Sequence, residues 1–298
     1  MPAATKPLAA LRSSEWLLIG YFGYVALITP LFPLSPQVKW LALAVFVLVA
    51  ALLAMLAAAE SYGSREIFSV ARDWVPFAVT LVAYREMDWF SPLMRNHAME
   101  LRWVDWDRSL LYGAGWQRAI EWLGALLPAY LECCYLLVYA VGPISVAILY
   151  GQRRRELVNR FLLVYLAGTL LVYALLPYFP SDPPRTLFAG TDLPNVITPI
   201  RTLNLWIVRG YGIHSSVFPS AHVSSAFSAA WALLWLLPEK KRYGWAMLAY
   251  AVSVAVATIY GRYHYAADAL AGLGIGIIAA LMILPFVLRR PRRARGLP

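Results

Sequence analysis

Two of the four histidines in this 298-residue chain stand at the start of long apolar runs. His222 ends the segment Val-Phe-Pro-Ser-Ala-His, and His264 lies within Gly-Arg-Tyr-His-Tyr-Ala-Ala-Asp. Asp268 follows His264 by one helical turn, where a carboxylate can accept an imidazole N–H and fix its tautomer. One imidazole could then act as a nucleophile and the other as an acid, the two groups that suit phosphoryl transfer.

The composition is that of a polytopic membrane protein. Hydrophobic residues make up 61% of the chain and charged residues 14%, whereas soluble domains are about half apolar and about a quarter charged. Uncharged stretches of roughly 18 residues or more are long enough to cross a bilayer. We therefore expect an all-α membrane helix bundle of about seven or eight spans. They lie near 15–33, 40–59, 127–150, 159–180, 219–237, 243–260 and 264–288, with a shorter one at 74–90.

This pattern divides the chain into three parts. Residues 1–126 are expected to form N-terminal membrane spans and an outer-face loop or amphipathic region. Residues 127–288 would form the catalytic membrane core, and residues 289–298 a basic cytoplasmic tail.

The net charge of +10 follows the expected spans and does not indicate nucleic-acid binding. Basic clusters lie at 153–160, 240–242 and 289–295, each beside the end of a span. The chain can be threaded with all three clusters on one side, which the positive-inside rule identifies as cytoplasmic. His222 and His264 then both lie at the extracytoplasmic face, each at the N-terminal end of its helix.

Three segments resemble the type 2 phosphatidic acid phosphatase superfamily, and most of all its inositol phosphorylceramide synthase-like branch. They are Pro180-Ser-Asp-Pro-Pro-Arg185, Phe218-Pro-Ser-Ala-His222 and Arg262-Tyr-His-Tyr-Ala-Ala-Asp268. The likeness covers about 160–288 and implies a six-helix phosphatidic acid phosphatase-like core. Before about residue 127 it is loose, through Arg72-Asp-Trp-Val-Pro76 and Asp107 ahead of Leu111-Tyr-Gly113.

The resemblance implies a role for each matching residue. His264 corresponds to the nucleophile that forms a phosphohistidine, Asp268 to its orienting carboxylate, and His222 to the general acid that protonates the departing oxygen. Arg185 corresponds to a phosphate-binding arginine, and Ser220 to a residue that contacts the phosphoryl oxygens. Family members of this kind need no metal or other cofactor.

Physical reasoning supports a phosphate site at these positions. Pro219 suits the first position of a helix, so the amides around Ser220 and His222 would point at a phosphate with the positive end of the helix dipole. Arg185 can bind two oxygens at once, because its guanidinium is planar and presents paired donors.

Two cations of the plain phosphatase pattern are missing. Tyr178 lies seven residues before Arg185, where the plain phosphatase has a lysine. Thr258 lies six residues before His264, where the plain phosphatase has an arginine. We expect Arg262 to supply one positive charge to the substrate, and Arg201 or Arg209 another.

Other polar residues have more than one interpretation. His97, with Glu100, Asp105 and Asp107, lies in a segment that could form a lid or headgroup pocket but is more typical of a solvated loop. Glu132 lies inside a span, where it could pair with an arginine or tyrosine or contact substrate. His214 could lie beside the site. The glycines at 272, 274 and 276 favour close helix packing.

These observations together predict an integral-membrane lipid phosphotransferase or phosphatase that acts on a phospholipid or sphingolipid in the bilayer. The Phe-Pro-Ser-x-His form and the missing cations favour headgroup transfer of the inositol phosphorylceramide synthase type. A lipid phosphate or polyprenyl diphosphate phosphatase is the first alternative. Two others are a metal site on His222, His264 and Asp268, and a non-catalytic transporter or scaffold with the same fold.

Overall fold

The computed structural model describes residues 11–62, 65–92 and 96–288 of the chain. In this part of the chain all regular structure is helical, with no β-strand. The predicted all-α class is confirmed. The basic tail predicted at 289–298 lies outside the described residues.

Seven helical segments among the described residues are long and apolar enough to cross a membrane. They are Ser13–Leu31, Pro36–Tyr62, Glu66–Phe90, Leu126–Gly151, Arg155–Tyr178, Arg242–Tyr260 and Ala266–Pro285. An eighth apolar helix, Ala221–Leu236, is shorter. The prediction of seven or eight spans is confirmed, and the span expected at 74–90 begins earlier, at Glu66.

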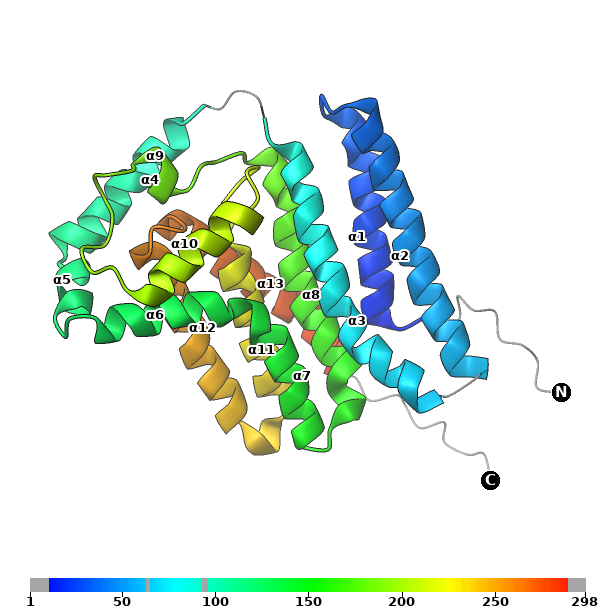
Figure 1. Cartoon of the computed structure of the whole chain (residues 1–298). Coiled ribbons are helices and arrows are strands. Elements are labelled where there is room, and N and C mark those ends of the chain that lie inside the picture. Colours follow the sequence, from blue (N-terminus) through cyan, green and yellow to red (C-terminus); the bar gives the residue numbers. More distant parts are fainter. Residues whose placement is uncertain (1–10, 63–64, 93–95, 289–298) are drawn as a thin grey trace.

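The spans form two groups, which Figure 1 shows side by side. The N-terminal group consists of α1 (Ser13–Ile28), α2 (Pro36–Tyr62) and α3 (Arg65–Glu86). The second group consists of α6 (Leu126–Leu136), α7 (Val141–Gly151), α8 (Val158–Leu175), α11 (Ala221–Leu236), α12 (Arg242–Tyr260) and α13 (Ala266–Leu288). A 3₁₀ turn at Leu137–Ala140 joins α6 to α7, where the chain bends sharply (Figure 1).

Helix α8 occupies the centre of the bundle. It packs against α1, α3, α7, α11 and α13, and Phe161, Leu162 and Leu166 on it are fully buried. These side chains are removed from both lipid and water, so α8 is the central helix around which the others pack.

Close packing of α13 against the start of α11 depends on glycine. A Cβ at Gly272 would lie 2.4 Å from the carbonyl oxygen of Ser220, and one at Gly276 would lie 3.0 Å from that of Ser224. Gly274 faces open space. The predicted packing role therefore holds for Gly272 and Gly276, and it brings the residues around His222 next to those around Asp268.

The two ends of the bundle differ in character. At one end the loops α7–α8 and α11–α12 meet, where Arg154 pairs with Glu239 and Lys240 Nζ donates to Gln152 Oε1 over 2.5 Å. Two of the predicted basic clusters thus lie on the same side. Beyond the other end lie short helices, at the left of Figure 1. They are α4 (Ala98–Arg108), α5 (Trp116–Glu121), α9 (Pro184–Leu187) and α10 (Pro199–Tyr211).

Candidate active site

His222 and His264 face each other at the end of the bundle that the short helices cover. His222 is the second residue of α11, and His264 lies in the loop Gly261–Tyr265 that joins α12 to α13. Their ring centroids are 5.5 Å apart, with the ring planes inclined at 60°. The structure therefore brings together two residues that are about forty positions apart in the sequence.

The surroundings of His264 determine which ring nitrogen carries its proton. Its Nδ1 lies 2.9 Å from the carbonyl oxygen of Val217 and 3.2 Å from Asp268 Oδ2. Both oxygens are acceptors, so Nδ1 holds the hydrogen and Nε2 keeps its lone pair. Asp268 is itself fixed, because its Oδ2 accepts the backbone N–H of Tyr265 over 2.9 Å. Asp268 thus lies where an orienting carboxylate was predicted.

Burial and the positive charge of Arg185 keep His264 neutral. Together they lower the pKa of His264 from its usual 6.5 to about 3. A neutral imidazole with a free Nε2 is the form that can attack an electrophile.

Aromatic side chains hold His222. Its ring stacks on that of Tyr135 with centroids 5.0 Å apart, and the ring of Tyr139 meets it edge-on at 5.4 Å. His222 Nε2 is buried and has no hydrogen-bond partner among the described residues. A buried nitrogen without a partner is costly, and a bound substrate could supply the missing one.

Arg185 lies beside the two histidines. Its backbone N–H donates to the carbonyl oxygen of Arg262 over 3.1 Å, and its Nη1 donates to that of Tyr263 over 3.2 Å. It lines a cavity of about 50 Å³ together with both histidines, and we call this space the histidine cavity. Arg185 therefore lies where it could bind a phosphoryl group held between the two rings.

A much larger space, of about 610 Å³, adjoins the histidine cavity. We call it the arginine chamber, because Arg185, Arg201 and Arg209 line it. Arg185, Val208, Ile213 and Val217 line both spaces, so the two are adjacent. The chamber could accommodate the part of a substrate that does not fit between the histidines.

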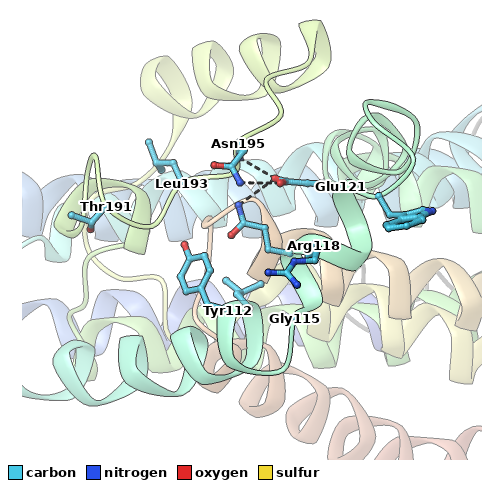
Figure 2. A pocket seen from close by; sticks show the side chains of 10 residues that line it. Tyr112, Gly115, Arg118, Glu121, Thr191, Leu193 and Asn195 are labelled. Carbon is cyan, nitrogen blue, oxygen red and sulfur yellow. Dashed lines mark hydrogen bonds between the residues drawn. The ribbon is translucent and has the colours of Figure 1, made fainter.

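A third cavity, of about 460 Å³, lies at α5 and the 191–195 loop (Figure 2). Glu121 accepts hydrogen bonds there from the backbone N–H of Asn195 over 2.9 Å and from its Nδ2 over 3.0 Å. Leu193 lines both this cavity and the arginine chamber. Glu121 thus fixes the loop that forms one wall of the chamber.

The start of α11 differs from the sequence expectation. The helix begins at Ala221, and Ser220 caps it by accepting the N–H of Val223 over 3.5 Å. The N–H of Ser220 donates to the backbone oxygen of Asp268 over 3.0 Å. Pro219 is therefore not the first helical residue, because serine is a much better cap, and the Ser220 amide is not free for phosphate. Only the amides of Ala221 and His222 remain at this helix end.

Arg262 does not reach the histidine cavity. Its side chain is 1% exposed, and Nη1 donates to Asp107 Oδ2 over 2.5 Å. The structure thus places this predicted substrate-binding residue in a buried ion pair behind the loop that carries His264.

Arg201 and Glu132 form a second buried pair. Arg201 Nη1 lies 2.7 Å from Glu132 Oε1, while Glu132 Oε2 accepts from Tyr263 OH over 2.7 Å. Of the alternatives for Glu132, pairing with an arginine and a tyrosine is the one observed. Arg201, unlike Arg262, also lines the arginine chamber.

The segment expected to be a solvated loop is helix α4, and two of its carboxylates are buried. Glu100 is 1% exposed and Asp107 is fully buried, whereas Asp105 is exposed. Glu100, Val104 and Asp107 lie on one face of the helix, a spacing visible in the sequence that would have predicted their burial. His97 lies beside Glu100, with 3.1 Å between Nδ1 and Oε1.

His214 lies at the chamber wall, not beside the two central histidines. Its side chain is 73% exposed, and its Nδ1 is 3.2 Å from Asp88 Oδ1. Among the residues that the structure describes, no three His, Cys, Asp or Glu side chains are grouped to hold one metal ion.

Comparisons with known proteins agree with this geometry. The family model of the PAP2 superfamily matches residues 103–282, which is more than half of the chain. A PA-phosphatase related-family protein of Dictyostelium discoideum is 28% identical over 137 residues, covering 41% of this chain. The match covers 22% of that relative, so the chain spans about a fifth of its length. No solved structure matches the chain. From the family match, this chain belongs to the PAP2 superfamily.

Proposed function

We propose that the protein is an integral-membrane lipid phosphotransferase that works through a phosphohistidine on His264. It would move a phosphate-linked headgroup from a phospholipid to an alcohol, as the inositol phosphorylceramide synthase-like branch does. The observation that carries the proposal is the histidine cavity itself, which His264, His222 and Arg185 line together.

In the first step, His264 Nε2 attacks the phosphorus atom of the lipid. A nitrogen–phosphorus bond forms as the bond from phosphorus to the departing alcohol oxygen breaks, and protonated His222 gives that oxygen its proton. The negative charge of the bound phosphate favours the protonated form of His222. Arg185 and the first amides of α11 stabilise the charge on the phosphoryl oxygens, which is the main task in phosphoryl transfer.

In the second step, an acceptor hydroxyl replaces the departed alcohol. Neutral His222 takes its proton, the hydroxyl oxygen bonds to phosphorus, and the bond to His264 breaks. Both histidines return to their starting states. Asp268 keeps the Nδ1–H of His264 oriented throughout, so that Nε2 remains the reacting atom.

The enclosure of the site supports an alcohol as acceptor in preference to water. His264 is 7% exposed, and the histidine cavity of about 50 Å³ has little room beyond a phosphoryl group. The arginine chamber provides an adjacent volume for a headgroup or acceptor, with Arg201 already neutralised by Glu132. Exclusion of water protects a reactive intermediate from hydrolysis.

The test is a product analysis. Purified protein in lipid vesicles is given phospholipids labelled at the headgroup phosphate, with a panel of polyol and long-chain lipid alcohols. We expect a new labelled phosphodiester that requires both an acceptor and His264, with His264→Ala as the matched control. If free phosphate or free phosphorylated headgroup is the only product with every acceptor, the protein is a hydrolase and the transferase proposal is wrong. If no labelled product forms at all, the non-catalytic alternative is favoured.

We further propose that the site opens to the extracytoplasmic side and the α7–α8 and α11–α12 loops to the cytoplasm. The basic residues at those two loops support this orientation. Thr191 and Glu239, at opposite ends of the bundle, are both exposed. In a background with Cys133 and Cys134 replaced by alanine, Thr191→Cys should react with an impermeant thiol reagent in intact cells and Glu239→Cys should not. The opposite labelling pattern would reverse the orientation.

A further inference from the structure

We propose that Asp107 is a positioning residue for the nucleophile, holding the loop of His264 from both sides. The inference rests on the proposed function of His264. Asp107 lies on α4, a helix that precedes the predicted catalytic core, so this helix would influence catalysis.

Asp107 makes two contacts that flank His264. Its Oδ2 accepts from Arg262 Nη1 over 2.5 Å, and its Oδ1 accepts the backbone N–H of Ala266 over 2.8 Å. Arg262 is two residues before His264 and Ala266 is two residues after it. A single fully buried carboxylate therefore fixes both ends of the five-residue segment that has the nucleophile at its centre.

The conformation of this segment requires such a partner. Arg262 has φ of 61°, in the left-handed region that arginine rarely adopts. Backbone strain of this kind costs free energy and persists only where the surroundings hold it. The ion pair with Asp107 is the contact that can offset this cost, because it engages the side chain of the strained residue itself.

The same loop also carries the contacts of Arg185. The carbonyl oxygens of Arg262 and Tyr263 accept from the backbone N–H and from Nη1 of Arg185. A shift of the loop would therefore move the nucleophile and the phosphate-binding arginine together. Asp107 touches neither the histidine cavity nor His264, so its contacts reach the nucleophile through the loop.

The expected consequence is slow chemistry with little loss of substrate binding. A displacement of about 1 Å at a reacting atom can cost about 100-fold in rate. The arginine chamber, which would hold the rest of the substrate, is lined by residues outside this loop. Loss of the Asp107 contacts should thus lower kcat far more than it raises KM.

The test compares Asp107→Asn with Asp105→Asn. Both substitutions remove one negative charge from α4, but the carboxylate of Asp105 is exposed and lies 3.9 Å from Arg108 Nη1. The reconstituted variants are mixed with a labelled phospholipid and stopped with alkali, which preserves phosphohistidine, so that the rate of phosphoenzyme formation is measured in a single turnover. We expect Asp107→Asn to slow this step by about 10- to 100-fold, with KM changed less than about threefold. Asp105→Asn should match the unaltered protein.

Asp107→Glu keeps the test decisive if the asparagine variant does not fold. Glutamate retains the charge for Arg262 but is one methylene too long to hold Ala266 in the same place. It should fold and still form the phosphoenzyme slowly. Wild-type rates in Asp107→Glu or in folded Asp107→Asn would overturn the inference, as would a raised KM with unchanged kcat. If the unaltered protein forms no phosphoenzyme at all, the proposed function fails instead, so the two failures can be told apart.

Discussion

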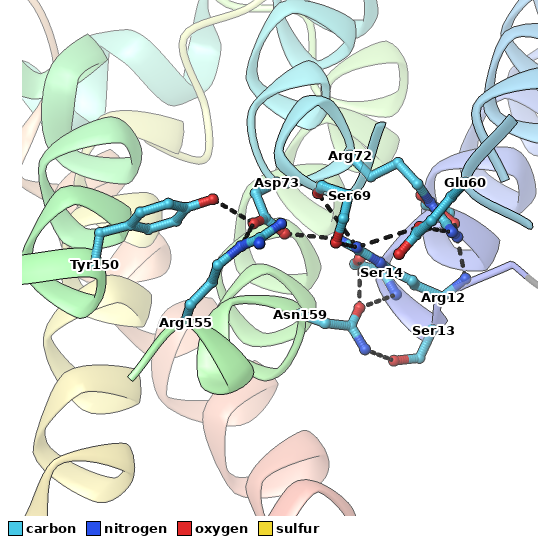
Figure 3. Close-up of polar contacts among 11 residues, drawn as sticks. Arg12, Ser13, Ser14, Glu60, Ser69, Arg72, Asp73, Tyr150, Arg155 and Asn159 are labelled. Atoms are coloured by element: carbon cyan, nitrogen blue, oxygen red, sulfur yellow. Dashed lines mark hydrogen bonds and ion pairs between the residues drawn. The ribbon is translucent and has the colours of Figure 1, made fainter. Parts of the chain in front are cut away.

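The bundle has a group of buried and half-buried charges at each end, and the two groups differ in how fully their polar atoms are paired. The N-terminal cluster joins α1, α2, α3 and the 3₁₀ turn Arg155–Leu157 that precedes α8 (Figure 3). It consists of Arg12, Glu15, Glu60, Arg72, Asp73 and Arg155. The active-site cluster consists of Asp107, His222, Arg262, His264 and Asp268. Both contain buried arginine–carboxylate pairs, but only the second contains the residues that we propose to be reactive.

Pairing in the N-terminal cluster is nearly complete. Arg72 donates to Glu15 through Nε over 2.7 Å and through Nη2 over 2.5 Å, and it also pairs with Glu60. Asp73 accepts from Arg12 over 2.6 Å and from Arg155 over 2.8 Å. Among the described residues, Arg155 Nη2 is the buried atom of this cluster without a hydrogen bond.

In the active-site cluster several buried atoms have no hydrogen-bond partner. They are His222 Nε2, Asp268 Oδ1, Arg262 Nε and Arg262 Nη2. Unsatisfied buried polar atoms are rare in native proteins and usually indicate a ligand, ion or strained functional site. The N-terminal cluster therefore holds helices together through paired charges, whereas the unpaired Nε2 of His222 is consistent with the substrate site that we propose.

The largest expected effect comes from removing the nucleophile. His264→Ala should abolish phosphoenzyme formation and lower turnover by at least about 10⁴-fold, because it removes the proposed nucleophile. Trapping of labelled protein from a labelled lipid donor measures this directly. A labelled phosphoprotein in the variant would show that another residue is the nucleophile.

The next effect depends on the leaving group. His222→Ala should slow reaction of lipid substrates by about 10²- to 10⁴-fold, because the departing alkoxide is no longer protonated. A nitrophenyl phosphodiester should be nearly unaffected, since its leaving group needs no proton. Parallel rates on the two substrates check this prediction, and equal losses on both would mean that His222 binds substrate without acting as an acid.

Asp268→Asn should have an intermediate effect. The amide is similar in size, but it cannot hold the Nδ1–H tautomer of His264 as a carboxylate does, so turnover should fall roughly 100-fold or more. The melting temperature should change much less than in a variant that disrupts packing. Full activity in a folded Asp268→Asn protein would show that Asp268 has no role in the mechanism.

The N-terminal cluster should affect stability and leave catalysis unchanged. Arg72→Met leaves Glu15 buried without its partner, which typically costs about 3–5 kcal/mol of unfolding free energy. Activity per folded molecule should stay within about twofold of the unaltered protein, since the cluster lies at the other end of the bundle. Thermal unfolding in detergent, with the exposed Lys241→Met as control, tests this. Lost turnover without lost stability would instead link the cluster to the site.

The spans and the central histidines could be predicted from the sequence because each depends on local information. Hydropathy identifies helices such as α2 and α8, and the one-turn spacing of His264 and Asp268 leads directly to their contact. The predicted parts 1–126 and 127–288 remain a prediction, although the family match begins at residue 103 and includes Asp107. Span position and helical spacing were accessible in this way, whereas the start of α11 and the helix α4 were not.

The long-range ion pairs could not be predicted. Nothing in the sequence around Asp107 says that its partner lies 155 positions away at Arg262, and charges in a polar segment are usually solvated. Arg262 was therefore expected at the phosphate, where a nearby cation was missing. In the fold, Arg262 pairs with Asp107 instead. This pairing becomes apparent only because α4 packs against α13.

The smallest expected effect is the absence of a change with pH. Burial, followed by the charge of Arg185, lowers the pKa of His264 to about 3, so the nucleophile should stay neutral throughout the range from pH 7.5 to 5. With an unshifted pKa of about 6.5, the neutral fraction would fall roughly 30-fold by pH 5. Single-turnover phosphoenzyme formation from a phosphodiester donor, whose own charge does not change in this range, isolates the effect. The rate should stay level over this range. A decline with a midpoint near pH 6.5 would mean that the nucleophile is solvated before it reacts. The site would then be open to water and would not exclude it.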